Sequence, residues 1–285
     1  MNGKSPPVAR SVAGLRRQVA LWRAAGERVG LVPTMGALHA GHLALVAAAR
    51  GQCERVVASI FVNPKQFGPR EDFATYPRPE ADDLAKLAGA AADLVFIPPV
   101  GEMYPDGFAT TISTGGPSQG LCGAQRPGHF DGVATVVAKL LIQAAPDAAY
   151  FGEKDYQQLM VMRRMARDLD LPVEIVGVPT VREPDGLALS SRNVYLSAEE
   201  RRVAPHLNRA MREAAAEIGR GAAPGPVLER AVASLTGLGF AIEYLELRDG
   251  VTLTRLFELS RPARLLAAAH LGHTRLIDNI PVART

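Results

Sequence analysis

Two histidines three residues apart, His39 and His42, are the first side chains in this sequence that could do acid–base chemistry. They follow a short apolar run, residues 30–34, and a turn that contains Gly36, and they precede a segment rich in Ala, Leu and Val. The pattern predicts a strand, a turn and a helix that carries both histidines on one face. Backbone N–H groups and the positive end of the helix dipole would lie beside them, which favours an anion such as phosphate. We therefore predict a nucleotide-phosphate site within residues 30–50.

The HxxH spacing alone also fits a partial metal site or two surface histidines at a helix start. A metal would need further ligands; none lies nearby in the sequence, and His129 is a remote candidate. The two cysteines, Cys53 and Cys122, form no CxxC pair, so we expect reduced packing residues and neither structural zinc nor a disulfide framework.

Composition excludes several classes of protein. The 285 residues are 47% hydrophobic and 21% charged, which is typical of a soluble globular chain with one large domain and a smaller one. The net charge is +3 and charges of both signs are interspersed, so no nucleic-acid partner is expected. The first eight residues lack the apolar segment of a signal peptide, and no apolar run approaches the ~20 residues that span a bilayer. We expect no membrane partner and a cytoplasmic location.

Strands and helices alternate through about residue 180. This alternation predicts an α/β fold with a Rossmann-like parallel sheet, in which ligands bind beyond the carboxyl ends of the strands. Helices are expected over residues 10–25, 79–89, 133–144 and 156–169, and strands over 55–62, 93–97, 110–114, 148–151 and 173–180. The segments that directly follow predicted strands are 35–42, 63–66, 152–155 and 181 onward. We expect these four polar segments to converge on one edge of the sheet.

The composition changes after Asn193. Helices are expected over residues 197–219 and 226–238, a hairpin over 240–250, and strands over 264–270 and 274–279. We predict a Rossmann-like catalytic domain over residues 1–187 and a small α+β C-terminal lid domain over 188–285. The pattern is poor from residue 100 to residue 130, and within this stretch residues 121–130 read as a Gly-rich loop. A loop that long in a compact domain is often functional, as a lid is.

Four strings of this sequence resemble, in order, those of the pantothenate synthetase (pantoate–β-alanine ligase) family, within the superfamily of nucleotidyltransferases that carry an HxGH signature. The strings are residues 33–42, 61–67, 151–158 and 190–193. The resemblance covers nearly the whole chain. It implies an AMP-forming ligase that condenses pantoate with β-alanine through pantoyl adenylate, releasing pyrophosphate and then AMP. It also implies ATP with Mg²⁺, and a homodimer.

The resemblance implies that four side chains, His39, His42, Lys154 and Arg192, are donors to the triphosphate and catalytic. His42 would donate a proton to the departing phosphate, which its near-neutral reference pKa allows. The implied ATP-binding residues are Met35, Gly36, Ala37, Leu38, His39, Ala40, Gly41, His42, Gly152, Glu153, Lys154, Asp155, Val181, Leu189, Ser190, Ser191 and Arg192. The implied substrate-binding residues are Gln66 (pantoate and β-alanine), Gln158 (pantoate), Met35 and Asn63.

Without the resemblance, simpler roles stay open. Glu153, Asp155 and Ser190 could cap helices, and Met35 could be a core residue. Many family members have Met where this chain has Leu189, a swap of similar size for which we expect little effect. No carboxylate can be assigned to Mg²⁺, which we expect the phosphates to hold. Two other functions also remain: an adenylyl- or cytidylyltransferase, and a non-catalytic nucleotide-binding protein.

Overall fold

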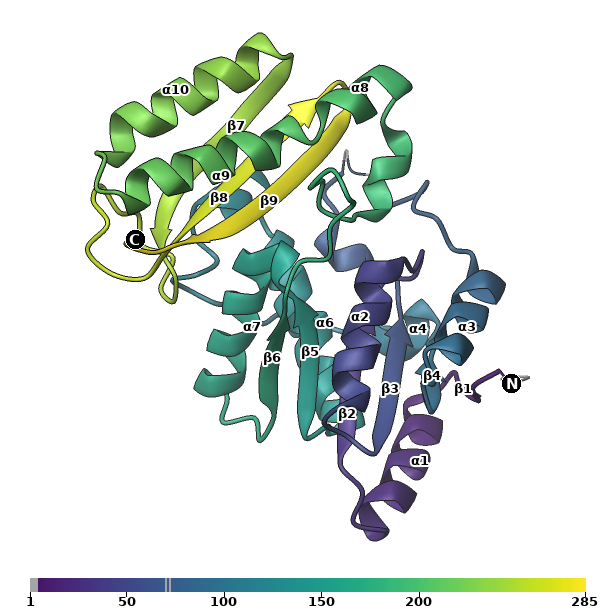
Figure 1. The fold of residues 1–285 in the computed structure, drawn as a ribbon. Coiled ribbons are helices and arrows are strands. Elements are labelled where there is room, and N and C mark those ends of the chain that lie inside the picture. The colour runs from purple at the N-terminus through teal and green to yellow at the C-terminus, as the bar shows by residue number, and fades with distance from the viewer. Residues whose placement is uncertain (1–4, 70, 72) are drawn as a thin grey trace. The chain divides into compact units, whose positions relative to one another are not determined.

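The structure, a computed structural model, describes residues 5–69, 71 and 73–285, which form two compact units (Figure 1). The first unit comprises the chain up to Gly115 together with residues 126–153 and 161–179. The second comprises residues 116–125, 154–160 and 180–285. The units are thus interleaved along the chain, and the functional division at residues 187 and 188 stays a prediction.

The first unit contains a six-stranded sheet in the order β1-β4-β3-β2-β5-β6, and every pairing is parallel. The strands are β1 (Val8–Ala9), β2 (Val29–Thr34), β3 (Arg55–Ile60), β4 (Leu94–Phe96), β5 (Ala148–Gly152) and β6 (Glu174–Val178). The parallel α/β sheet predicted from the alternating pattern is therefore confirmed. The strand order reverses between β2 and β5, since β3 and β4 lie on one side of β2 and β5 lies on the other. Such a switch point is where open α/β sheets bind ligands.

Helices cover both faces of this sheet, which explains its apolar strands. Val56, Val57 and Ala58 of β3 are all fully buried, without the alternation of a half-exposed strand. Val56 and Ala58 share a core with helix α2 (Ala40–Arg50), whereas α6 (His129–Ala144) contacts β2; Figure 1 shows α2 in front of the strands and α6 behind them. The remaining helices of this unit are α1 (Val12–Ala24), α3 (Glu80–Gly89), α4 (Val100–Met103), the 3₁₀ turn η1 (Pro64–Gln66) and the end of α7 (Tyr156–Asp168).

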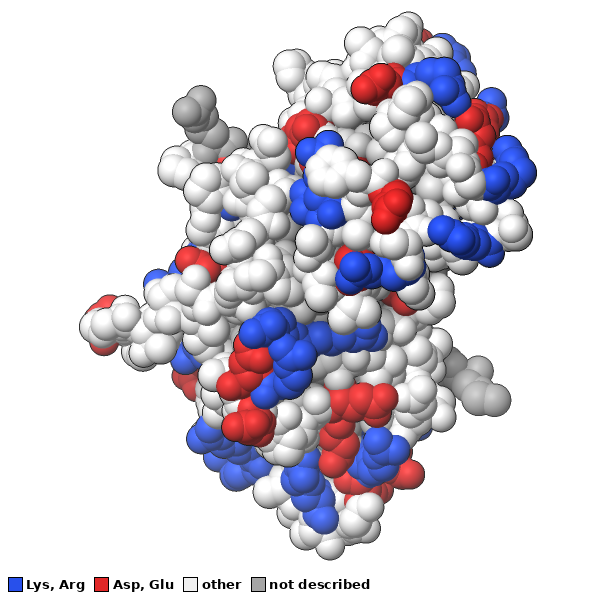
Figure 2. Space-filling view, turned by 90° about the vertical axis from the view of Figure 1, so that its left-hand side faces the viewer, with Lys and Arg blue, Asp and Glu red and all other residues white. Residues whose placement is uncertain are grey.

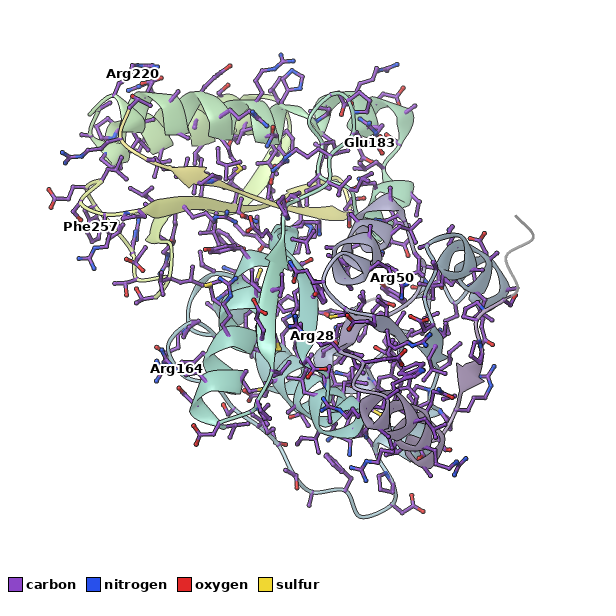
Figure 3. All side chains as sticks on the ribbon, turned by 60° about the horizontal axis from the view of Figure 1, so that its bottom comes forward. Arg28, Arg50, Arg164, Glu183, Arg220 and Phe257 are labelled. Atoms are coloured by element: carbon purple, nitrogen blue, oxygen red, sulfur yellow. The ribbon has the colours of Figure 1, made fainter. Side chains whose placement is uncertain are left out.

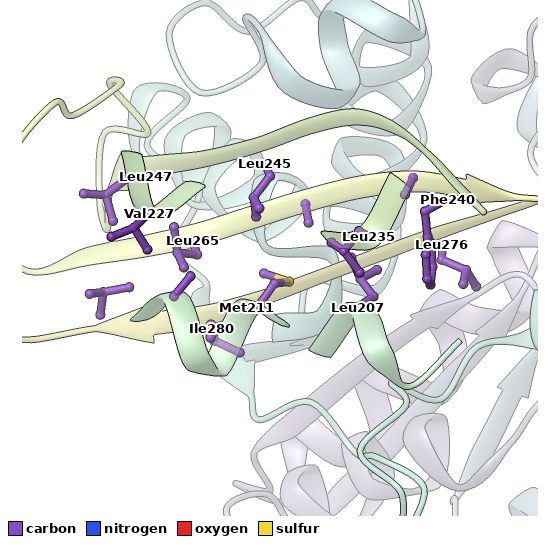
Figure 4. Close-up of a cluster of buried hydrophobic side chains, with 14 of the residues drawn as sticks. Leu207, Met211, Val227, Leu235, Phe240, Leu245, Leu247, Leu265, Leu276 and Ile280 are labelled. Carbon is purple, nitrogen blue, oxygen red and sulfur yellow. The ribbon is translucent and has the colours of Figure 1, made fainter. Parts of the chain in front are cut away.

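The second unit is a three-stranded antiparallel sheet, β7-β8-β9, packed against helices α9 and α10. Its elements are α5 (Leu121–Gln125), η3 (Ser191–Tyr195), α8 (Ala198–Val203), α9 (His206–Gly219), α10 (Pro224–Gly237), β7 (Phe240–Asp249), β8 (Ala263–Leu271) and β9 (Thr274–Val282). Met211, Phe240 and Leu265 are buried in its core (Figure 4). The predicted α+β character of this region is confirmed.

Four predicted elements are wrong, each because of a partner distant in sequence or a proline. The hairpin expected over 240–250 is a single strand, β7, whose antiparallel partner β8 begins only at Ala263. Residues 110–114 form no strand, and the N–H of Ile112 donates instead to Oγ1 of Thr135 on α6 at 2.9 Å. Residues 121–130 are not a loop throughout, since they form α5 and the start of α6. The helix expected over 197–219 is two helices, α8 and α9. Pro205 lies between them and has no backbone N–H with which to continue the helical hydrogen bonds.

On the face that Figure 2 shows, Lys and Arg side chains lie among Asp and Glu side chains. At the amino ends of the strands, Arg50 pairs with Asp93 at 2.7 Å and the N–H of Arg28 donates to Glu54 at 2.9 Å (Arg28 and Arg50 are labelled in Figure 3). The charged residues at the amino edge of the sheet are therefore engaged in contacts within the protein. Among the residues described, no helix is long and apolar enough to cross a membrane.

Candidate active site

The turn that follows β2 is held by two side chains of α3. Asp83, only 1% exposed, accepts hydrogen bonds from the N–H groups of Ala37 at 2.8 Å and Leu38 at 2.7 Å. Lys86 Nζ donates to the carbonyl oxygen of Leu38 at 2.7 Å. Gly36 has a φ of +84°, and a Cβ there would lie 2.9 Å from Asp83 Oδ2. The turn therefore requires glycine at this position and a carboxylate behind it.

The two histidines begin α2, but not as two residues of one helical face. His39 is the N-cap, with φ −134° and ψ 176°, so the prediction that it lies within the helix is wrong. Its Nδ1 accepts from the N–H of Gly41 at 3.1 Å, and Nδ1 of His42 accepts from the N–H of His39 at 3.4 Å. The ring centroids are 4.1 Å apart. The residues still lie together, because the capping box brings the third helical residue back to the N-cap.

This capping geometry determines which ring nitrogen of each histidine can donate. A nitrogen that accepts a hydrogen bond carries no proton, so the neutral tautomers of His39 and His42 have their proton on Nε2. Both rings thereby present an N–H at the amino end of α2, where the helix dipole is positive. Such an arrangement stabilises negative charge on a phosphate.

The loop after β3 brings three predicted substrate residues into contact. The Asn63 side chain, 1% exposed, accepts from the hydroxyl of Tyr104 at 2.7 Å and donates to Oε1 of Gln66 at 3.0 Å. Nε2 of Gln66 donates to Sδ of Met35 at 3.1 Å. Burial raises the pKa of Tyr104, so its hydroxyl stays a donor at neutral pH. The Gln66 amide is thus oriented by both neighbours, and each of its ends keeps hydrogen-bonding capacity for a ligand.

The sheet order explains why residues far apart in sequence meet in the first unit. Met35 follows β2, Asn63 follows β3, and Gly152 ends β5, and these strands are parallel neighbours. Their carboxyl ends therefore lie at one edge, which is the part of the predicted convergence that falls within this unit. Glu153, the next residue after Gly152, begins the 3₁₀ turn η2 (Glu153–Asp155).

In the second unit, the chain after β5 places Lys154 and Asp155 in η2 and Gln158 in the first turn of α7. The carbonyl oxygen of Lys154 accepts from Asn279 Nδ2 at 2.9 Å, and its Nζ lies 3.8 Å from Oδ2 of Asp155. Only 20% of the Lys154 side chain is exposed. The backbone of this lysine is thus tied to β9.

The other predicted ATP residues lie within the segment 181–192, in which the chain reverses direction. The N–H of Leu189 donates to the carbonyl of Val181 at 3.0 Å, so these two predicted residues are neighbours. Ser190 caps η3, because its Oγ accepts from the N–H of Arg192 at 3.3 Å. Arg182 anchors the segment through an ion pair at 2.7 Å to Asp278, whose side chain is 3% exposed. Ser191 is the first residue of η3.

Several residues that position the site are absent from the sequence-based prediction. Gln157, 4% exposed, accepts from the N–H of Cys122 at 3.0 Å and donates to the carbonyls of Pro117 and Gly120. The Gln-Gln pair at 157–158 is visible in the sequence, but not which member is buried. Asp83 is likewise visible only as an acidic residue in the first turn of a helix.

The structure gives His129 a role other than that of a remote metal ligand. Its Nδ1 lies 2.9 Å from the carbonyl oxygen of Gln66 and its Nε2 lies 2.9 Å from Arg126 Nη1. Among the described residues, no group of three or more His, Cys, Asp or Glu side chains is placed to hold a metal ion.

Replacing Asp83 with asparagine is expected to lower kcat/KM for ATP by about 10²-fold, because the amide nitrogen would face a backbone N–H as a second donor and displace the turn. Steady-state kinetics at saturating co-substrates measure this. Asp82→Asn is the matched control, since the neighbouring Asp82 side chain is 61% exposed and pairs only with Lys86 at 2.6 Å among the ion pairs described. Equal activity of the two variants would contradict the role of Asp83.

Comparison with known proteins identifies the family. The profile of the pantoate-beta-alanine ligase family matches residues 7–281. The pantothenate synthetase of Rhodospirillum rubrum is 60% identical over 278 residues, covering 97% of this chain and 99% of the relative. The crystal structure of pantothenate synthetase from Thermus thermophilus matches with a TM-score of 0.90 at 51% identity, over 97% of this chain and 99% of that one.

A third relative was solved with ligands bound. It is the pantoate-beta-alanine ligase from Francisella tularensis in complex with beta-gamma ATP and beta-alanine; its TM-score is 0.81 at 33% identity, covering 96% of this chain and 97% of that one. The family match and these relatives all span nearly the full length. The chain therefore belongs to the pantoate-beta-alanine ligase family, whose members are ATP-dependent ligases.

Proposed function

We propose that this chain condenses pantoate with β-alanine at the expense of ATP, through a pantoyl-adenylate intermediate. Family membership over residues 7–281 supports the reaction class. The observation that carries the proposal within the structure is the histidine pair at the switch point, with the Gln66 amide contacting Met35 beside it. The first feature suits a phosphate and the second suits a carboxylate or hydroxyl.

The first step transfers the adenylyl group. A carboxylate oxygen of pantoate attacks the α-phosphorus of ATP, the bond from that phosphorus to the bridging oxygen breaks, and pyrophosphate leaves with the electron pair. Negative charge grows on the phosphate oxygens, and the Nε2–H groups of His39 and His42 are placed to stabilise it. We assign to His42 a hydrogen bond from Nε2–H to the departing pyrophosphate. Full transfer of a proton would require the imidazolium form, because a neutral ring that gave up its Nε2 proton would be left as an imidazolate.

The second step forms the amide. The β-alanine amine attacks the carbonyl carbon of pantoyl adenylate, the bond from carbon to the AMP oxygen breaks, AMP leaves with the electron pair, and the amine releases a proton to solvent. Gln66 is proposed to bind pantoate and β-alanine, and Gln158 to bind pantoate. Neutral amides suit this task because they bind a carboxylate without adding charge to a site that admits ATP. Asn63 orients Gln66 through its 3.0 Å hydrogen bond.

The remaining predicted residues are proposed to bind ATP. Lys154 and Arg192 would contact phosphate oxygens, with Ser190 and Ser191 presenting the arginine. The other proposed ATP residues are Met35, Gly36, Ala37, Leu38, Ala40, Gly41, Gly152, Glu153, Asp155, Val181 and Leu189. Mg²⁺ is proposed to enter with ATP and to neutralise phosphate charge, held chiefly by the phosphates. Loss of exchange activity in EDTA and its return with Mg²⁺ tests this point.

We further propose that the chain is a homodimer that works in the cytoplasm on small-molecule substrates. Light scattering at several protein concentrations measures the oligomeric state.

Pantoate-dependent exchange of pyrophosphate into ATP tests the reaction directly. We expect exchange with ATP and pantoate alone, and release of AMP only after β-alanine is added. Exchange without pantoate, or exchange driven only by a phosphate ester, would instead favour a nucleotidyltransferase that makes a dinucleotide-like product. ATP binding without turnover when all three substrates are present would favour a non-catalytic protein.

Replacing Gln158 with alanine is expected to raise the KM for pantoate about tenfold or more. Without the glutamine amide, a hydrogen-bonding group of bound pantoate is left unpaired, which weakens binding. The KM for ATP should change little. Gln158→Glu should be worse still, since a carboxylate would repel that of pantoate. Initial rates at varied pantoate concentration measure both variants, and an unchanged pantoate KM would count against the assignment.

A further inference from the structure

We propose that Arg126, His129 and Glu71 form a clamp that positions Gln66 for the substrate, so that they are positioning residues of the reaction. The inference rests on the proposed role of Gln66 in binding pantoate and β-alanine. All four residues belong to the first unit, yet their side chains come from segments far apart in the sequence.

The clamp closes on the backbone of Gln66, not on its amide side chain. His129 Nδ1 lies 2.9 Å from the carbonyl oxygen of Gln66, and Nη2 of Arg126 donates to the same oxygen at 3.4 Å. A carbonyl oxygen has two lone pairs and can accept two hydrogen bonds. The two donors here are Arg126, which precedes α6, and His129, which begins it. The side chain of Gln66 meanwhile contacts Asn63 and Met35. Backbone and side chain are thus fixed by different partners.

The contacts of His129 determine its tautomer. Arginine can only donate, so Nε2 of His129, which lies 2.9 Å from Arg126 Nη1, must be the acceptor. Nδ1 then carries the proton and donates to Gln66. A neutral imidazole with this tautomer satisfies both neighbours at once, and neither phenylalanine nor alanine can do so.

Glu71 holds the arginine in place. Its two oxygens accept from Arg126 Nε at 2.8 Å and from Nη2 at 2.6 Å, a bidentate pair in which 17% of the arginine side chain and 27% of the glutamate side chain are exposed. Burial raises the pKa of the Glu71 carboxyl, but the hydrogen bonds and charge of Arg126 outweigh that effect and lower it below its ordinary value. The pair is therefore intact at neutral pH and is lost only as the pH falls below the usual carboxyl range.

The first turn of α6 packs in direct contact with the same loop. A Cβ at Gly132 would overlap the carbonyl group of Lys65 and lie 2.7 Å from the nitrogen of Gln66. Asn63 Nδ2 donates to the carbonyl oxygen of Gly132 at 3.1 Å. Helix α6 and the η1 turn therefore touch backbone to backbone, and the clamp residues lie at the edge of this contact. The contact therefore fixes the backbone position from which the Gln66 side chain projects.

A double-mutant cycle between His129 and Gln66 tests the proposal. His129→Phe keeps the ring that packs on Phe130 (centroids 5.0 Å apart) and removes both nitrogens. We expect the KM for pantoate to rise about 10- to 100-fold, as for a misplaced binding group, with the KM for ATP within about threefold of the parent. His129→Asn retains a donor near the position of Nδ1 and should recover part of the loss. In the Gln66→Ala background, His129→Phe should change the pantoate KM by less than about threefold, because the residue that the clamp positions is gone.

Arg78→Met is the matched control. Arg78 donates to the carbonyls of Tyr76 and Phe73 at 3.2 and 3.0 Å in the same loop region but does not contact Gln66 among the interactions described. We expect its pantoate KM to stay at the parent value, and thermal melts establish that each variant is folded. Should His129→Phe fail to fold, the cycle with His129→Asn carries the same comparison.

Two results would overturn the clamp: a normal pantoate KM in folded His129→Phe, or a full effect of that substitution in the Gln66→Ala background. The second would mean that His129 acts on the substrate without Gln66. A normal pantoate KM in Gln66→Ala alone would instead refute the proposed role of Gln66, which separates failure of the proposed function from failure of the clamp.

Discussion

Replacing His42 with alanine is expected to slow pantoate-dependent pyrophosphate exchange by about 10²- to 10⁴-fold, the range for loss of a positioned general acid. The Nε2–H of His42 is placed by the hydrogen bond from the His39 N–H to Nδ1, at the positive end of α2. That interaction strengthens as charge develops on the leaving pyrophosphate, so it acts on the transition state more than on bound ATP. The dissociation constant for ATP should therefore change much less than the rate.

His42→Gln separates two roles of the ring. A glutamine amide donates a hydrogen bond from about the position of Nε2 but does not transfer a proton at neutral pH. If His42 acts mainly by hydrogen bonding, His42→Gln should recover much of the activity. If it transfers a proton, the glutamine variant should be about as slow as His42→Ala. Near-normal exchange in the alanine variant, measured on folded protein, would contradict both roles.

Replacing Lys154 with methionine is expected to lower kcat/KM for ATP by about 10²- to 10³-fold, as expected for loss of one preorganised donor to a transferring phosphoryl group. Methionine retains the apolar stem and removes the ammonium. The backbone of Lys154 is held by Asn279, so the side chain starts from a fixed point. Radiolabelled ATP consumption at varied ATP concentration gives the value.

Two further variants show whether the charge or its geometry matters. Lys154→Arg keeps the charge but replaces a compact ammonium with a planar fork, and we expect partial recovery only. Asp155→Asn removes the carboxylate 3.8 Å from Nζ at a proposed ATP residue, and we expect a loss in kcat/KM for ATP that is smaller than that of Lys154→Met, because the ammonium is retained. Full activity of Lys154→Met would refute a phosphate contact of this lysine.

The sequence predicts those parts of the fold that local pattern controls. Val56, Val57 and Ala58 are consecutive apolar residues without alternation, and residues 55–60 form β3, a strand covered on both faces. Ser197 and Glu200 form the capping box that begins α8, as their spacing indicates. The helix expected over 156–169 is α7 at 156–168. In each case the cause lies within a few residues of the effect.

The remaining features depend on partners that local pattern does not reveal. The three-residue spacing of His39 and His42 fits both two positions within a helix and the two ends of a capping box. The hydrogen bond that Nδ1 of His39 accepts from the Gly41 N–H shows that His39 is the N-cap. The segment 121–130 looks like a loop because of Gly123 and Gly128, yet the buried Gln157 amide accepts from the N–H of Cys122 within α5. The family resemblance supplied the predicted site residues. It did not supply Asp83 or the residues around the Gln66 carbonyl, whose roles arise from contacts across at least 45 residues of sequence.

The direct contact of Gly132 with the η1 backbone also affects how the loop can open. No side chain lies between the two segments, and Asn63 Nδ2 donates to the carbonyl oxygen of Gly132, so movement of either segment away from the other breaks this hydrogen bond and exposes the close contact. Residues 63–66 and the first turn of α6 should therefore behave as one cooperative unit, with a shared opening free energy. Amide hydrogens in these two segments, separated by more than sixty positions in the chain, would then exchange with solvent at a common rate of opening.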